Sequence, residues 1–308
     1  MEFTSLKQIV ELGRQVPGHK VMAVPAAAGG HVVEAVVQAR AEGLAGAVLI
    51  GDAEKLRTLL REQGQNPSDY DILASESDED SARKAVALIN EGSANFILKG
   101  MLTTTELLRQ VVRRESNLRT GRTMSHLAFY ELPKTMYHKL LFSTDGGMVN
   151  PQDRQRKADI VHNTVETLRA LGYELPKAAL LCCKEEVDEH MPETVDARAV
   201  RELARRGDFG PCFVEGPISY DIAMSREKAC IKKFDCPYCG NFDAIIAPEI
   251  HAGNIIGKCY SVTCGARVAA IVVGARVPIV VTSRASGADT KLTSIAAAAL
   301  VAARGSGN

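Results

Sequence analysis

A hydroxyl, a guanidinium and a carboxylate stand close together near the end of the sequence, at Ser283, Arg284 and Asp289. They follow an apolar run, 279–282, that is typical of a strand, and they precede an Ala-rich helical pattern, 289–303. A strand end of this kind delivers polar side chains to the edge of a sheet. Arg suits phosphate oxygens and a carboxylate can take a proton. The segment therefore indicates phosphate binding with proton transfer, although a plain helix cap beside a surface Arg also fits the spacing.

A second cluster lies after the apolar run 244–247 and Pro248. Gly253 permits close approach of the backbone. Asn254 and Lys258 are four residues apart, so on a helix they share one face and can meet a ligand together. An ordinary loop leading into a helix is the alternative interpretation.

Lys99 and Gly100 directly follow a third apolar run, 96–98. Thr103 and Glu106 then have the spacing of a capping box, which predicts that a helix begins at residue 104. Strand ends and helix N-termini are where open α/β sheets bind anions. We therefore predict that Lys99 and Gly100 lie at a binding edge.

The elements that must position these residues alternate along the chain. Short apolar runs that predict strands are separated by helical patterns, and repeated units of this length predict an α/β fold with parallel strands covered by helices. We expect a turn at Gly216-Pro217. The first predicted strand, 21–24, leads into Ala26–Gly30, which lacks the glycine spacing of a dinucleotide site, so a nicotinamide dehydrogenase is excluded.

Length and composition exclude further classes of function. The chain has 308 residues, which favours two domains with a cleft between them, and its 37 Lys plus Arg balance 37 Asp plus Glu. A zero net charge argues against a nucleic-acid binder. The N-terminus lacks an apolar signal region and no apolar run is long enough to span a bilayer, so we expect a cytoplasmic protein without a membrane partner. Its eight cysteines are then expected to be reduced.

Eight segments in one order resemble the phosphate acetyl/butyryltransferase family, and most closely its phosphate butyryltransferases. The resemblance covers about residues 20–303. The segments are KGML at 99–102, LRTGR at 118–122, MSHL at 124–127, STDGGMVNPQ at 143–152, MPETVDARAV at 191–200, GPISYDIAMS at 216–225, APEIHAGNIIGK at 247–258 and SRASGADTKLTSIA at 283–296.

The resemblance implies a reversible reaction, acyl-CoA plus phosphate giving acyl phosphate plus coenzyme A, with a butyryl-like acyl group favoured. It implies two parallel-sheet α/β domains with the site in the cleft, a fold like that of isocitrate and isopropylmalate dehydrogenases. Residues 1–126 plus 275–308 would form the first domain and 127–274 an inserted second domain. It also implies a homodimer or higher homo-oligomer, no metal, and no cofactor beyond the substrate coenzyme A.

Site roles follow from the same resemblance. Arg284 would hold the phosphoryl group, Ser283 would hydrogen-bond the phosphate or the developing oxyanion, and Asp289 would take the proton of the coenzyme A thiol. Further residues would line the acyl-phosphate site or bind the phosphates of coenzyme A. The first set is Lys99, Gly100, Ser125, Asn254 and Lys258, and the second is Arg109 and Arg122.

The chain departs from the family pattern at Thr103, Ile222 and Gly257, where His, Asn and Tyr are usual. These positions lie near the acyl pocket in the family, so the resemblance leaves the identity of the acyl group and the retention of activity open. They also keep open a second hypothesis, a non-catalytic protein that binds coenzyme A or an acyl phosphate. Retention of Ser283, Arg284 and Asp289 favours the enzyme.

Cys236 and Cys239 form a C-x-x-C pair that a plain loop replaces in relatives. Three interpretations stay open: structural cysteines, a redox-sensitive pair, or half of a zinc site that Cys259 and Cys264 would complete.

Overall fold

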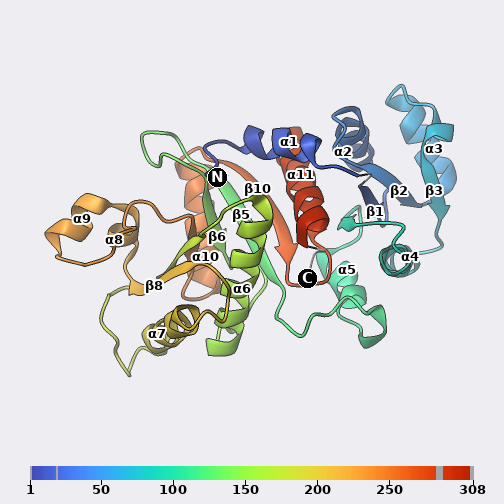
Figure 1. The fold of residues 1–308 in the computed structure, drawn as a ribbon. Coiled ribbons are helices and arrows are strands. Elements are labelled where there is room, and N and C mark those ends of the chain that lie inside the picture. Colours follow the sequence, from blue (N-terminus) through green and yellow to red (C-terminus); the bar gives the residue numbers. More distant parts are fainter. Residues whose placement is uncertain (1, 19, 282–286, 306–308) are drawn as a thin grey trace. The chain divides into compact units, whose positions relative to one another are not determined.

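The computed structural model describes residues 2–18, 20–281 and 287–305 (Figure 1). The chain divides into two compact units. The terminal unit holds residues 7–121 and 269–308, and the central unit holds residues 1–6 and 122–268. The sequence predicted the changes of domain at residues 126/127 and 274/275; the chain passes between the units at 6/7, 121/122 and 268/269.

The terminal unit is built on strands that run in the order β3-β2-β1-β4-β11-β10. All neighbouring pairs are parallel except β10 with β11, which is antiparallel. Because the chain moves outward to β2 and β3 on one side of β1 and to β4 on the other, the strand order reverses between β1 and β4. The strands are β1 (Val21–Val24), β2 (Gly46–Gly51), β3 (Asp71–Ala74), β4 (Phe96–Leu98), β10 (Arg267–Val273) and β11 (Ile279–Val280).

Helices connect these strands, as the alternating pattern predicts. The helix α11 packs against α2, β4 and β11. It is Ala-rich and is buried along most of its length, so its backbone can lie close to its neighbours. The helices are α1 (Leu6–Gln15), α2 (Gly30–Ala41), α3 (Ala53–Glu62), α4 (Asp78–Asn90), α5 (Thr104–Val111) and α11 (Ala288–Gly305), with the short 3₁₀ turns η1 (Pro67–Asp69) and η2 (Arg114–Ser116).

The central unit has its own strand order, β5-β6-β9-β7-β8. The pair β5–β6 is antiparallel and the remaining pairs are parallel. The strand β9 lies between β6 and β7, so the strand order also reverses here. The strands are β5 (Ser125–Glu131), β6 (Leu141–Thr144), β7 (Lys177–Leu181), β8 (Phe213–Ile218) and β9 (Ala244–Ile246).

The helices of the central unit again alternate with its strands. The longest, α6, begins at the N-cap Asp153 and ends at Gly172, whose left-handed backbone terminates it. The elements are α6 (Arg154–Leu171), α7 (Pro192–Arg205), α8 (Tyr220–Met224), α9 (Arg226–Ile231), α10 (Ile250–Lys258) and the π-helical turn η3 (Cys259–Thr263).

The predicted turn at Gly216-Pro217 is wrong. Both residues lie inside β8, at the edge of the sheet of the central unit. A proline is tolerated there because an edge strand can spare one backbone donor. Gly216 is needed for a close approach, since a Cβ on it would lie 2.5 Å from the Cβ of Leu180. The β7–β8 register shifts at this point.

No helix in the described parts of the chain combines the length and the apolar character that crossing a bilayer requires.

Candidate active site

Two loops meet at the carboxyl ends of β1 and β4, where the strand order of the terminal unit reverses. The N–H of Gly100 donates to Pro25 O at 3.1 Å, and the N–H of Met101 donates to Ala26 O at 2.8 Å. A Cβ on Gly100 would clash with both of these carbonyl oxygens. Glycine at position 100 therefore lets the segment after β4 lie directly on the segment after β1.

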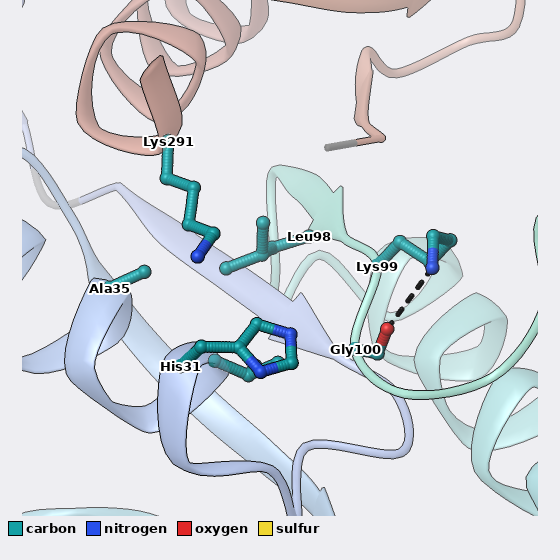
Figure 2. Close-up of a pocket in the computed structure, with 7 residues that line it drawn as sticks. His31, Ala35, Leu98, Lys99, Gly100 and Lys291 are labelled. Atoms are coloured by element: carbon teal, nitrogen blue, oxygen red, sulfur yellow. Dashed lines mark hydrogen bonds between the residues drawn. The ribbon is translucent and has the colours of Figure 1, made fainter. Parts of the chain in front are cut away.

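A pocket opens beside these loops (Figure 2). Helix α2 begins at its edge with Gly29 as the N-cap, and no side chain caps the helix. A Cβ on Gly29 would meet the Met101 side chain, which lies directly against this helix end. The pocket is lined by His31, Val32, Ala35, Leu98, Lys99, Gly100 and Lys291.

The two lysines of the pocket are held differently (Figure 2). Lys99 Nζ bends back onto its own loop and donates to Gly100 O at 3.2 Å and to Leu102 O at 2.9 Å. Lys291 extends from α11 towards Leu98 and His31. The structure thus brings the predicted residues Lys99 and Gly100 into one cationic pocket at a strand edge.

The second predicted cluster lies on α10 of the central unit. Glu249 is its N-cap, and the carboxylate accepts hydrogen bonds from the N–H groups of His251 and Ala252. Asn254 Nδ2 donates to Gly146 O at 2.9 Å. Lys258 is exposed in the last turn of this helix.

The loop after β6 packs on this helix through Asp145, which is fully buried. A Cβ on Gly253 would lie 2.5 Å from the Asp145 carbonyl oxygen, so only glycine allows the two backbones to meet. The carboxylate accepts hydrogen bonds from four backbone N–H groups, which satisfy its buried oxygens. The donors are His126 at 2.5 Å, Gly147 at 2.8 Å, Met148 at 2.7 Å and Val149 at 3.3 Å.

Ser125, a predicted substrate-binding residue, begins β5 and is fully buried. Its hydroxyl accepts a hydrogen bond from Asn163 Nδ2 at 3.1 Å, and the same amide donates to Thr123 O at 2.8 Å. The neighbouring His126 has its pKa lowered by burial, while the charge of Asp145 acts in the opposite direction. The imidazole is therefore kept neutral.

The two arginines predicted to bind coenzyme A have different surroundings. Arg109 is exposed in the last turn of α5. Arg122 is half-buried and forms an ion pair with Glu166, with 2.7 Å between Nη2 and Oε2. An anion that binds Arg122 therefore shares this guanidinium with a carboxylate.

Of the three predicted catalytic residues, only one is described. Ser283 and Arg284 lie outside the described residues. Asp289 lies in the first turn of α11 and is exposed. An acidic side chain is favourable at this end of a helix.

The three departures from the family pattern have structural explanations. Thr103 caps α5, and its capping box with Glu106 is complete as predicted. Ile222 is fully buried in α8. Gly257 faces Tyr130, since a Cβ there would lie 2.5 Å from the phenol oxygen. Burial raises the pKa of Tyr130 to about 12, so the phenol stays protonated.

Cys236 and Cys239 are both buried. Burial raises the pKa of both thiols, that of Cys239 to about 12, which disfavours the reactive thiolate. Within the described ranges, no three His, Cys, Asp or Glu side chains gather as metal ligands. Cys259 and Cys264 therefore do not complete a four-ligand set with this pair.

Sequence reasoning missed two residues of the cationic pocket, His31 and Lys291. His31 follows the small-residue segment after β1, which lacks the glycine spacing of a dinucleotide site. Lys291 lies two residues beyond Asp289 in an Ala-rich helix, where composition does not reveal which face is buried. Its position close to a predicted site was the available signal.

Comparisons with known proteins agree with this architecture. Residues 71–299 match the family described as phosphate acetyl/butaryl transferase. The chain is 38% identical to the phosphate butyryltransferase of Clostridium acetobutylicum, covering 92% of this chain and 93% of that protein. It is 33% identical to the phosphate acetyltransferase of Thermotoga maritima, covering 96% and 99%.

A crystal structure of a branched-chain phosphotransacylase from Enterococcus faecalis superposes with a TM-score of 0.78 at 27% identity, covering 92% of this chain and 99% of that one. The fold is thus that of an α/β enzyme of the phosphotransacylase class. More particularly, the chain belongs to the phosphate acetyl/butaryl transferase family, whose members are phosphate acyltransferases.

Proposed function

We propose that the protein transfers a short acyl group between coenzyme A and inorganic phosphate, with a butyryl-like or branched group preferred over acetyl. The names of the relatives support this preference. Two phosphate butyryltransferases and one protein named as a probable phosphate butyryltransferase are 34–38% identical to the chain, and the superposed structure from E. faecalis is a branched-chain enzyme. Acetyltransferases at 33–35% identity make acetyl the competing substrate.

The proposed step is a direct transfer. The coenzyme A sulfur attacks the carbonyl carbon of an acyl phosphate, a C–S bond forms, the C–O bond to phosphate breaks, and phosphate leaves with the bonding electrons. Asp289 takes the thiol proton, because a thiolate is the better nucleophile. Arg284 and Ser283 stabilise charge on the phosphate and on the carbonyl oxygen.

The remaining predicted residues keep their proposed roles. Lys99, Gly100, Ser125, Asn254 and Lys258 serve the acyl-phosphate site, and Arg109 and Arg122 serve coenzyme A. The observation that carries the proposal is the cationic pocket at the β1–β4 edge, on Lys99 and Gly100. A cytoplasmic homo-oligomer without metal, with an arrangement like that of isocitrate dehydrogenase, completes the proposal.

A panel of acyl-CoA substrates tests this function. Release of coenzyme A is followed in phosphate for acetyl-, propionyl-, butyryl-, isobutyryl- and isovaleryl-CoA. We expect the highest kcat/KM for a four- or five-carbon group. A maximum at acetyl-CoA would refute the preference. Binding of coenzyme A with no turnover of any substrate would instead favour the non-catalytic hypothesis.

Two variants test the catalytic roles. Arg284→Ala removes the phosphate ligand, so it should raise KM for phosphate and lower kcat. Asp289→Asn removes the base, so it should lower kcat, by roughly 10²-fold or more, with little change in KM. Steady-state kinetics at varied phosphate separates the two effects. Near-normal kinetics in both variants would refute these assignments.

A further inference from the structure

Lys291 is an unusual lysine because it is only 7% exposed. Within the described residues, no hydrogen-bond acceptor or carboxylate partners its Nζ. Its side chain runs from α11 into the pocket beside Leu98 (Figure 2). A buried ammonium is normally paired, since removing a charge from water without a partner is costly.

The surroundings of Lys291 make this cost larger. The pocket also holds the first turn of α2, whose end carries a partial positive charge from the helix dipole. The N-cap is Gly29, and no side chain among the described residues caps this end of the helix. None of the described residues that line the pocket is acidic. A cation and a helix N-terminus therefore face one space without an anion.

The chemistry of the pocket selects its ligand. Helix N-termini bind phosphate through backbone N–H groups, and a lysine adds a point charge. His31 on the first turn of α2 adds a ring nitrogen to the same space. The pocket shares its loop with Gly100, whose tight contact with the segment after β1 holds this edge rigid.

We propose that Lys291, His31 and the first turn of α2 form a subsite for a phosphate group of a substrate. This inference rests on the proposed function for the identity of the substrates. The phosphate group belongs either to inorganic phosphate or to coenzyme A, and the experiment distinguishes these two sources.

The binding arm measures thermal unfolding with increasing inorganic phosphate, and separately with coenzyme A, with chloride holding the ionic strength constant. Lys291→Met removes the charge at similar length. Lys55→Met, at an exposed site on α3 of the same unit, is the control for a lost positive charge. We expect ligand to raise the unfolding midpoint of the parent and of Lys55→Met, and to raise that of Lys291→Met much less.

The unliganded proteins give a second signature. Removal of this positive charge from beside the N-terminus of α2 should leave Lys291→Met as stable as the parent, or more stable. A lysine with a purely structural role would instead leave the variant less stable and equally responsive to ligand. That result would overturn the proposal. His31→Gln, at a half-buried position, repeats the binding test with a milder change.

Steady-state kinetics identify which substrate supplies the bound phosphate group. Loss of a charged hydrogen bond should raise the relevant KM by about tenfold or more in Lys291→Met, with a smaller rise in Lys291→Arg. A rise confined to inorganic phosphate assigns the subsite to that substrate. A rise for coenzyme A that disappears with 3′-dephospho-coenzyme A assigns it to the 3′-phosphate. A rise in KM for both coenzyme A and 3′-dephospho-coenzyme A assigns the subsite to the pyrophosphate.

Both KM values within twofold of the parent, with an unchanged thermal response, would overturn the subsite. Failure of the proposed function is distinguishable, because the binding arm requires no turnover. If the parent consumes no acyl-CoA but phosphate or coenzyme A stabilises it and not Lys291→Met, the subsite holds and the proposed reaction fails.

Discussion

The two units carry groups of opposite charge at the carboxyl ends of their strands. In the central unit, Glu249 caps α10 with a carboxylate, and the buried Asp145 accepts four backbone N–H groups. In the terminal unit, Gly29 precedes α2 without a capping side chain, and Lys291 points into the pocket beside it. One unit supplies its own anions to its strand edge, and the other presents positive groups there.

This difference separates groups that hold the fold from groups that are ready for a ligand. A polar group that the chain itself satisfies contributes to stability and leaves little for a substrate to bind. An unsatisfied one weakens the unliganded protein and binds a partner more strongly. Substitutions around Asp145 and Glu249, at the strand edge of the central unit, should therefore mainly lower stability. Substitutions around Gly29, Gly100 and Lys291, at the strand edge of the terminal unit, should also change ligand binding.

The largest effect should come from Asp145→Ala. It leaves several buried N–H groups without an acceptor, so we expect a loss of about 3 kcal/mol or more in the free energy of unfolding. Urea denaturation measures it. A loss below about 1 kcal/mol would show that water replaces the carboxylate easily and would weaken the comparison.

Gly100→Ala should destabilise the terminal edge by about 1–3 kcal/mol, because the added Cβ meets the carbonyl oxygens of Pro25 and Ala26. The displaced loop should also raise KM for phosphate. Gly30→Ala is the matched control, since a Cβ on Gly30 has open space. Equal stability of the two variants would contradict the close packing.

Gly30→Asp places a carboxylate at the N-terminus of α2, as Glu249 does at the N-terminus of α10. A carboxylate in the first turn of α2 should stabilise the unliganded protein by about 0.3–1 kcal/mol. It should also weaken phosphate binding, because it occupies the same positive end. Thermal unfolding with and without phosphate measures both effects. Weaker binding without a gain in stability would show that the helix end needs no anion.

The smallest effect should be a pH dependence from His126. Burial keeps its folded pKa below the ordinary value of 6.5, so the unfolded chain takes up a proton that the folded chain does not. This contribution to stability is present above that value and is lost as the pH falls below it. Between pH 7.5 and 5.5 we expect the free energy of unfolding to fall slightly, and His126→Gln should remove this fall. An identical pH slope in the variant would contradict the assignment.

The sequence predicted the elements well where periodicity and capping agree. The capping box of Thr103 and Glu106 predicted the start of α5, and the apolar run before Lys99 predicted a strand edge. The strand through Gly216-Pro217 was missed, because its tolerance for proline depends on lying at a sheet edge. Edge position is a property of the whole sheet and not of the local sequence.

The pocket was only half predicted for a similar reason. Lys99 could be predicted because it directly follows a strand. The location of Lys291 in the pocket depends on which face of α11 packs against α2. In a helix with so many alanines, hydrophobic periodicity does not mark that face. The partners of Asp145 were equally hidden, since they are backbone groups whose positions depend on the path of a loop.

The contact between Gly257 and Tyr130 limits which side chains the two positions can carry together. The phenol of Tyr130, supplied by β5, fills the space that a side chain at position 257 would need. A side chain at position 257 therefore requires either a displaced Tyr130 ring or a shift of β5 or α10. Among relatives, a large residue at either position should accompany a small one at the other.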